Sequence, residues 1–332
     1  MVQFKRLTLE HVNWEELDRF GDRTVFETLP WLRFLEKTQH AETIVAAIEH
    51  SGKIAGYFTG LIVRKYGVKI LGSPFRGWST YYMGFNLLPE YNRREVLKAF
   101  PSFAFDQLKC HYFEIADLNF KEDDYADLGY TTKKINSYEI DLTQSEEELF
   151  ARMKSTCRWS IRKAEKNGVY IEESRDMGFV DDYYDQLIDV FAKQSLVPRF
   201  SRSRVKELIA NLLPSGNLLL LRARREDGLG IATGIFPAFN DRMFSWGLAS
   251  RREDQRLRPN ELLLWYAMRY WKAKGMKKLD MCGQDEYKRK YGVYKITVPI
   301  LIMGKYEILF KLRDLAVEMV RARRDIWGYL KR

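Results

Sequence analysis

The stretch Gly283-Gln-Asp-Glu-Tyr287-Lys288-Arg-Lys-Tyr291-Gly292 decides the fold of this chain, because of what precedes it. We expect a strand over Lys277-Lys-Leu-Asp280-Met-Cys and, before it, an amphipathic helix from Asn260 to Lys274 that Gly275 ends. Apolar residues that recur at helical spacing predict one buried face, and glycine commonly follows the last residue of a helix. The order helix, strand, then tyrosine and lysine between two glycines places polar groups at the end of a buried strand.

The same order of elements occurs twice along the chain. In each half, two apolar segments flank a short turn and predict a hairpin, and a helix then leads into another strand. The expected hairpins span 43–64 and 217–239, and the first half has its helix over 93–109. Helices beside hairpins predict the α/β class, with a mixed sheet covered by helices. The repetition predicts two tandem, duplicated domains of this kind.

A capping box marks the expected join between the two copies, because Glu148 follows Ser145 at the spacing of that motif. We therefore expect a first domain over residues 1–142, a second over 143–304, and a separate helix over 305–332. Lysine follows the tyrosine of the second copy at Lys288, where the first copy has Ala126. This difference favours catalysis in the second domain and recognition or scaffolding in the first.

Composition limits the classes of partner and compartment. The chain has 332 residues, of which 46% are hydrophobic, yet no apolar run approaches the roughly 18 residues of a membrane span. The amino-terminal sequence lacks the apolar segment of a signal peptide, and the spacing of the three cysteines and four histidines predicts no metal site. We expect a cytoplasmic protein. The net charge of +10 favours an acidic partner, such as phosphate, tRNA or anionic lipid, although it also serves solubility.

A basic helix is expected between the two copies, from Glu146 to Asn167. Its cations recur every four residues and so form one stripe: Lys154, Arg158, Arg162 and Lys166. Arginine can donate two parallel hydrogen bonds to a phosphate group, so the stripe is a candidate phosphate-binding row. The alternative is a solvated face that nearby glutamates balance.

This helix carries the strongest resemblance to a known family. The string Arg152-Met-Lys-Ser-Thr-Cys-Arg-Trp-Ser-Ile-Arg-Lys-Ala-Glu-Lys-Asn-Gly168-Val resembles a segment of the Fem-type transferases and their polysaccharide-associated relatives, a branch of the GNAT acyltransferases. Together with the hairpins, the helix after Pro259 and the closing Tyr-Lys motif, the similarity covers nearly the whole chain. It implies two GNAT folds in tandem that transfer an acyl or aminoacyl group to an amine of a cell-envelope, glycan or lipid-linked precursor.

The resemblance also assigns candidate catalytic residues. The lysine of the family motif aligns with Lys288, which it places near the reacting carbonyl or a donor phosphate. Tyr287, Asp280, Asp285 and Tyr291 are the neighbouring candidates for proton handling and substrate positioning. The sequence does not separate their roles.

The donor is expected beside the segment that precedes the helix over 260–274. Arg256, Arg258 and Asn260 lie there, and Pro259 stands where the GNAT pattern has its first glycine. With the basic stripe, these residues are the candidate donor-binding set. The chain has no room for the long helical arm of many tRNA-using relatives, so acyl-CoA, such as acetyl-CoA, is the preferred co-substrate. Aminoacyl-tRNA is the alternative, and a binding module without catalysis is a second one.

Two further segments have open interpretations. The aromatic run around Trp78, Tyr81 and Tyr82, together with Trp246, is the candidate acceptor-binding set, and buried core is the alternative. The segment Tyr306 to Leu330 predicts a basic amphipathic helix with aromatic residues near its end. Such a helix can contact an anionic membrane at the inner face, or it can pack on its own domain. The sequence predicts no oligomeric state.

Overall fold

The structure is a computed structural model that describes residues 1–65, 67–192, 196–198 and 200–306. These residues form two compact units: unit 1 comprises 1–135 and 297–306, and unit 2 comprises 136–296. The expected boundaries at 142/143 and 304 differ from these limits. The difference arises because β7 (Thr131–Asp141) and β14 (Tyr294–Gly304) each contribute residues to both units. The predicted tail over 305–332 lies outside the described residues beyond Tyr306.

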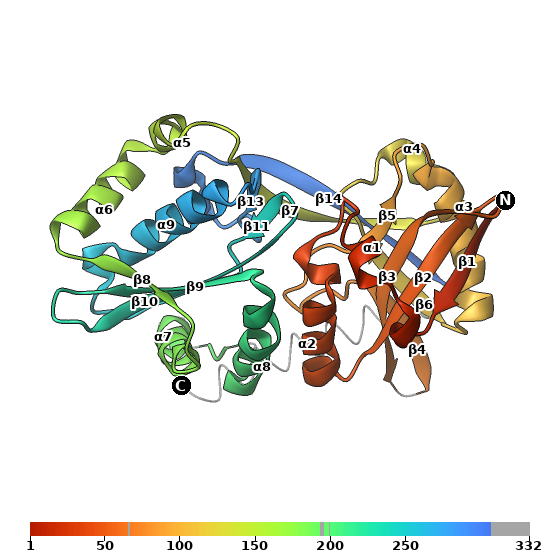
Figure 1. Cartoon of the computed structure of the whole chain (residues 1–332), viewed down its shortest axis with the longest axis horizontal. Helices are drawn as coiled ribbons and strands as arrows, with labels where there is room; N and C mark the ends of the chain where they lie inside the picture. Colours follow the sequence, from red (N-terminus) through yellow and green to blue (C-terminus); the bar gives the residue numbers. More distant parts are fainter. Residues whose placement is uncertain (66, 193–195, 199, 307–332) are drawn as a thin grey trace. The chain divides into compact units, whose positions relative to one another are not determined.

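Unit 1 has a mixed sheet whose strands follow the order β1-β2-β3-β4-β6-β14, and β5 pairs with β3. The pairs are antiparallel except for β4 with β6, which is parallel. The strands are β1 (Val2–Leu7), β2 (Glu42–His50), β3 (Lys53–Lys65), β4 (Val68–Ser73), β5 (Gly84–Leu87) and β6 (Tyr112–Ala116), and the helices are α1 (Trp14–Leu17), α2 (Leu29–Gln39), α3 (Arg93–Ser102) and α4 (Glu122–Tyr125) (Figure 1). The hairpin expected over 43–64 is therefore confirmed. The helix expected over 93–109 ends as α3 and continues through a wider turn, Phe103–Gln107.

A cluster of buried charges lies inside unit 1. Glu27 is 1% exposed and accepts a hydrogen bond of 2.8 Å from the backbone N–H of Thr24. Burial raises the pKa of Glu27 to about 7, and the nearby Arg23 only partly opposes this shift. Burial likewise raises the pKa of Asp22 and of Asp117. Unit 1 therefore holds more carboxyl groups than it can keep ionised without cost.

Replacing Glu27 by glutamine should stabilise unit 1 at alkaline pH. The pKa of Glu27 is raised from 4.5 to about 7, so its contribution to stability is fully present below pH 4.5 and is lost as the pH rises through 7. Glutamine stays neutral, and we expect the free energy of unfolding at about pH 8 to rise by on the order of 1–3 kcal/mol. Denaturant unfolding at acidic and alkaline pH measures this. The exposed Glu10→Gln is the control, and an unchanged pH dependence in Glu27→Gln would contradict the prediction.

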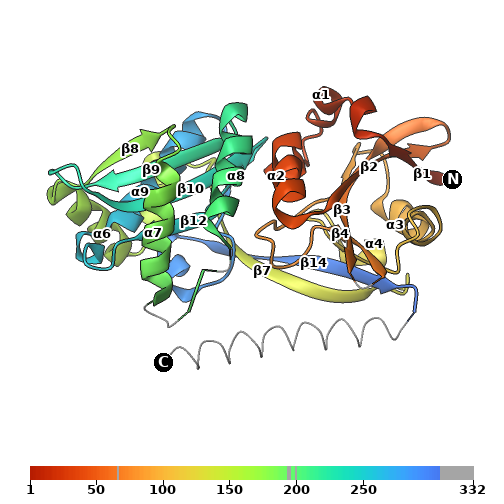
Figure 2. The same ribbon diagram turned by 90° about the horizontal axis from the view of Figure 1, so that it is seen from below.

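Unit 2 has a sheet in the order β7-β13-β11-β10-β9-β8, and β12 pairs with β10. Its strands are β8 (Tyr170–Ser174), β9 (Leu218–Arg224), β10 (Gly230–Phe239), β11 (Arg242–Phe244), β12 (Gly247–Ser250) and β13 (Lys278–Asp280), and its helices are α5 (Glu146–Arg152), α6 (Ser155–Lys166), α7 (Phe179–Ala192), α8 (Arg202–Leu212) and α9 (Pro259–Ala273). Helices α6 and α9 cover one face of this sheet, and α7 and α8 lie on the other (Figures 1 and 2). The predicted α/β class, the second hairpin and the helix over 260–274 are confirmed.

The single helix expected from Glu146 to Asn167 is wrong, because the chain breaks it into α5 and α6. Met153 and Lys154 have extended backbones, with ψ of 145° and 148°. The Arg158 guanidinium donates to the carbonyl of Ala151 at 2.9 Å and to that of Met153. An arginine that satisfies the last carbonyls of α5 thus stabilises the break.

Candidate active site

Residues 242–250 form two strands, β11 and β12, and the division between them shapes the candidate active site. β11 runs parallel to β13, with Phe244 opposite Asp280. The N–H of Ser245 still donates to the carbonyl of Asp280 at 2.9 Å, but the next residue, Trp246, donates its N–H to Ile235 of β10. β12 then pairs with β10. β13 therefore ends at Asp280 just where the neighbouring strand turns away from it.

A buried hydrogen-bond network holds the turn that follows β13. The Asp280 side chain is fully buried and accepts from the Ser137 hydroxyl at 2.7 Å and from the Cys282 N–H at 2.7 Å. The Ser137 oxygen in turn accepts from the Gly283 N–H at 2.9 Å. Cys282 and Gly283 both have positive φ, 57° and 126°. Asp280 is thus a positioning residue for this turn. Sequence reasoning missed Ser137, which lies 143 residues earlier.

Lys288 lies against this turn. It belongs to the 3-10 segment Glu286–Tyr291 and is 6% exposed, an unusual burial for lysine. Its Nζ is 2.6 Å from Asp285 Oδ2 and donates to the Cys282 carbonyl at 3.4 Å. A Cβ on Gly283 would lie 3.4 Å from the same Nζ. Three of the predicted catalytic residues, Asp280, Asp285 and Lys288, therefore meet at one turn.

The tyrosines of the motif are protonated at neutral pH. Tyr287 is half-exposed beside Lys288, and desolvation of its hydroxyl raises its pKa. Tyr291 is buried, which raises its pKa well above the usual value. Both phenols can donate hydrogen bonds, and neither is a base near pH 7.

A partly buried ion pair joins the Lys288 segment to the helices beside it. Lys290 Nζ lies 2.7 Å from Glu261 Oε1 in the first turn of α9. The Lys290 carbonyl accepts a hydrogen bond of 2.9 Å from the N–H of Lys154, the residue that precedes α6. The Lys288 turn, the start of α9 and the start of α6 are thus held together.

The predicted donor residues gather at the start of α9. Arg258 precedes the helix in a left-handed conformation with φ of 64°, and the exposed Arg256 lies in the short 3-10 turn before it. Asn260 donates to the Ser250 hydroxyl at 3.1 Å, across from the end of β12. A helix start offers free N–H groups to an anion, and Pro259 at the first helical position removes only one that would have no partner within the helix.

The predicted basic stripe on α6 is only partly available. Arg158 is engaged by the carbonyls that end α5, as described above. The Arg162 guanidinium lies 5.3 Å from the centre of the Phe150 ring and is exposed. Lys154 precedes α6, so the four cations do not form one continuous helical row.

The predicted acceptor residues divide between the two units. In unit 1, Tyr82 is 1% exposed and belongs to the core. Trp78 is half-buried, and the centre of its ring lies 4.7 Å from that of Phe75. Tyr81 is half-buried, 5.8 Å from Phe26. In unit 2, Trp246 lies at the division between β11 and β12.

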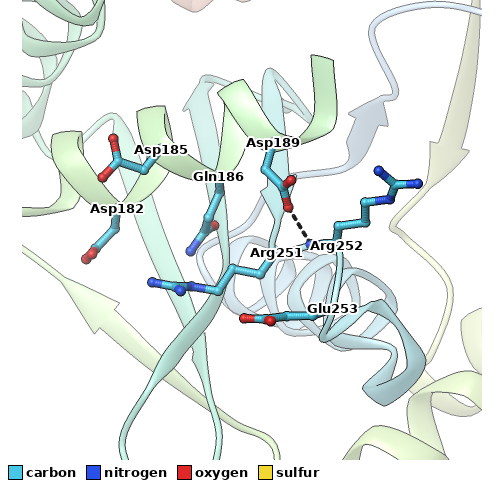
Figure 3. A pocket seen from close by; sticks show the side chains of 7 residues that line it. All are labelled: Asp182, Asp185, Gln186, Asp189, Arg251, Arg252 and Glu253. Carbon is cyan, nitrogen blue, oxygen red and sulfur yellow. Dashed lines mark hydrogen bonds between the residues drawn. The ribbon is translucent and has the colours of Figure 1, made fainter. Parts of the chain in front are cut away.

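An open pocket of about 730 Å³ lies in unit 2, on the face that α7 covers. Its lining is Asp182, Asp185, Gln186, Asp189, Arg251, Arg252 and Glu253 (Figure 3). The Arg252 N–H donates to Asp189 at 2.6 Å. The pocket therefore borders the first residues of the segment that leads to Arg258.

Two absences apply to the described part of the chain. Residues 1–65, 67–192, 196–198 and 200–306 contain no group of three His, Cys, Asp or Glu side chains arranged for a metal ion. Within the same residues, no helix has the length and hydropathy needed to cross a bilayer.

Comparison with known proteins agrees with this geometry. Residues 151–289 match the family model described as an acetyltransferase (GNAT) domain. The matched residues include the divided strand, the start of α9 and Lys288. No curated protein matches the sequence.

Solved structures share the fold at low sequence identity. The crystal structure of FemX matches with a TM-score of 0.76 at 14% identity, over 93% of this chain and 99% of that chain. A tandem GNAT protein from the clavulanic acid biosynthesis pathway matches with a TM-score of 0.55 at 10% identity, over 92% and 98%. L-PGS from Bacillus licheniformis matches with a TM-score of 0.52 at 13% identity, over 89% and 96%. Residues 151–289 therefore match a GNAT acetyltransferase domain, and the chain shares its fold with FemX and with a tandem GNAT protein.

Proposed function

We propose that this protein is an N-acyltransferase that moves an acyl group from acyl-CoA to an amine of a cell-envelope, glycan or lipid-linked precursor. The observation that carries the proposal is the buried Lys288 ammonium, held at the end of β13 by Asp285 and the Cys282 carbonyl. It lies at the position where the neighbouring strand diverges. A buried cation there is suited to stabilise negative charge that develops on a reacting carbonyl.

The proposed reaction needs few protein groups. The amine nitrogen attacks the thioester carbonyl, a C–N bond forms, the C–S bond breaks, and CoA leaves as the thiol after the amine proton has been lost. Lys288 stabilises the oxyanion of the tetrahedral intermediate. The largely exposed carboxylate of Asp285 accepts a hydrogen bond from the Lys288 ammonium and so orients it. The protein's main contribution is to position donor and acceptor.

The start of α9 fits the phosphates of such a donor. Arg256 and Arg258 have no carboxylate partner among the described residues, so both charges are available. Glu261, the acid in the first turn, is buried and neutralised by Lys290. The N–H groups of that turn can bind a phosphate oxygen. Arginine side chains thus replace the glycine-rich loop of the usual GNAT pattern.

Aminoacyl-tRNA is the second candidate donor. The Fem-type resemblance implies it, and the shared fold with nearly all of the FemX chain is consistent with it. The net charge of +10 also suits a polyanion. With this donor Lys288 keeps its role, since an ester carbonyl develops the same oxyanion. A non-catalytic binding module is the third candidate function.

The release of free CoA thiol tests whether acyl-CoA is the donor. Purified protein is mixed with acetyl-CoA and a panel of amines that includes amino sugars, stem peptides and aminolipids, and thiol release that depends on the amine is measured. We expect turnover with acetyl-CoA and at least one amine. A parallel arm uses radiolabelled aminoacyl-tRNA with the same amines, and transfer in that arm alone would make tRNA the donor. No transfer in either arm would contradict the enzymatic proposal.

A further inference from the structure

An exposed tryptophan stands on α6 beside the start of α9. Trp159 is 53% exposed, although the neighbouring residues Cys157, Ser160 and Ile161 are buried against the core. Large aromatic side chains usually bury most of their surface. The indole of Trp159 is therefore an apolar surface that unit 2 does not use for its own packing.

Two cations lie close to this indole ring. The Lys163 ammonium lies 4.7 Å from the ring centre, and the Arg258 guanidinium lies 5.9 Å from it. Neither side chain has a carboxylate within ion-pair distance among the described residues. Two unneutralised charges around one ring repel each other, and an anion placed between them would relieve that repulsion.

The Arg258 backbone supports a functional role for this group. Its φ of 64° lies in the left-handed region, where a residue other than glycine, asparagine or aspartate is uncommon. This residue also occupies the position directly before α9, the proposed site of the donor phosphates. The indole and the donor site thus share Arg258.

We propose that Trp159, Lys163 and Arg258 bind the adenine nucleotide end of acyl-CoA. This inference rests on the function proposed above and adds the recognition of the nucleotide. The base stacks on the indole, because stacking accepts any purine face. Lys163 and Arg258 contact the ribose phosphate, and Arg258 also serves the phosphates at α9. An adenosine next to phosphate also ends every tRNA, so the test separates the two sources.

Binding of acetyl-CoA to Trp159→Ala tests the inference. Loss of one base stack should weaken binding on the order of tenfold, and Trp159→Phe should restore most of it. Acetyl-pantetheine lacks the nucleotide, so its turnover should be the same in the wild type and in Trp159→Ala. The matched control is Tyr170→Ala, which removes another exposed aromatic side chain from unit 2.

The charges are tested separately. Lys163→Gln should weaken the binding of acetyl-CoA more than the binding of dephospho-CoA, which lacks the ribose phosphate. Lys206→Gln, which removes an exposed lysine from α8, should change both affinities little. Calorimetric titration at low salt measures these affinities, and the effect of Lys163→Gln should shrink at high salt.

Three outcomes would overturn the inference. Equal acetyl-CoA binding by the wild type and Trp159→Ala would show that the nucleotide does not stack on the indole, and it would leave the transferase proposal intact. An equal loss of acetyl-pantetheine turnover would make Trp159 a structural residue. Weaker tRNA binding by Trp159→Ala with unchanged acetyl-CoA binding would assign the indole to the other donor. Failure of the wild type to bind or use acetyl-CoA at all would instead refute the proposed function itself.

Discussion

Replacing Lys288 by methionine should lower kcat on the order of 100-fold or more, with the melting temperature nearly unchanged. Removing one donor that stabilises an oxyanion typically has an effect of about 10²–10³ on the rate. Methionine is nearly as long as lysine and suits a site that is 6% exposed. Asp285 is largely exposed and tolerates the loss of its partner. Steady-state kinetics with a saturating donor, beside thermal unfolding, measures both quantities.

The matched control is Lys295→Met, the same change at an exposed position at the start of β14. It should leave kcat unchanged. If Lys288→Met keeps its activity per folded molecule but unfolds at a much lower temperature, Lys288 has a structural role, and the catalytic assignment is wrong.

Replacing Asp280 by alanine should lower the free energy of unfolding of unit 2 by on the order of 3 kcal/mol. The change leaves the Ser137 hydroxyl and the Cys282 N–H buried without their acceptor. It also removes a negative charge that favours the charged form of the buried Arg242. Because the turn after β13 carries Lys288, activity should fall as well. Chemical denaturation followed by tryptophan fluorescence measures the loss of stability.

Asp280→Asn separates the hydrogen bonds from the charge. The amide oxygen can still accept from Ser137 and Cys282, so this variant should lose much less stability than alanine. Ser137→Ala should lie between the two, because the Gly283 N–H loses its acceptor. An Asp280→Ala protein that is as stable as the wild type but inactive would contradict a positioning role and favour direct participation in proton transfer.

Local patterns predicted much of this fold. Both hairpins and the helices of each half appear close to their expected positions, because apolar periodicity and turn residues act over a few neighbouring positions. The Tyr-Lys motif likewise located Lys288 and Asp285, which meet within four residues of chain. A long helix with buried residues at regular spacing, such as α9, is the kind of element that sequence patterns describe best.

Features that depend on distant residues were not predictable. Hydropathy gives no sign that the strand over 242–250 divides at Ser245, because the division depends on pairing with β13 and β10. The pairing of Ser137 with Asp280 joins residues far apart in sequence. The break at Met153 also escaped prediction, since the apolar spacing continues through it and Arg158, expected to bind phosphate, satisfies the carbonyls there.

Hydrogen–deuterium exchange with and without acetyl-CoA tests most directly the claim that the donor lies between the start of α9 and Lys288. Exchange by mass spectrometry reports protection of individual segments without knowledge of the acceptor. We expect acetyl-CoA to protect peptides that cover 251–262 and 280–288, together with the part of α6 around Trp159. Peptides of α3 and α4 in unit 1 should exchange as before. Absence of protection in these segments, or protection confined to other parts of the chain, would contradict the account.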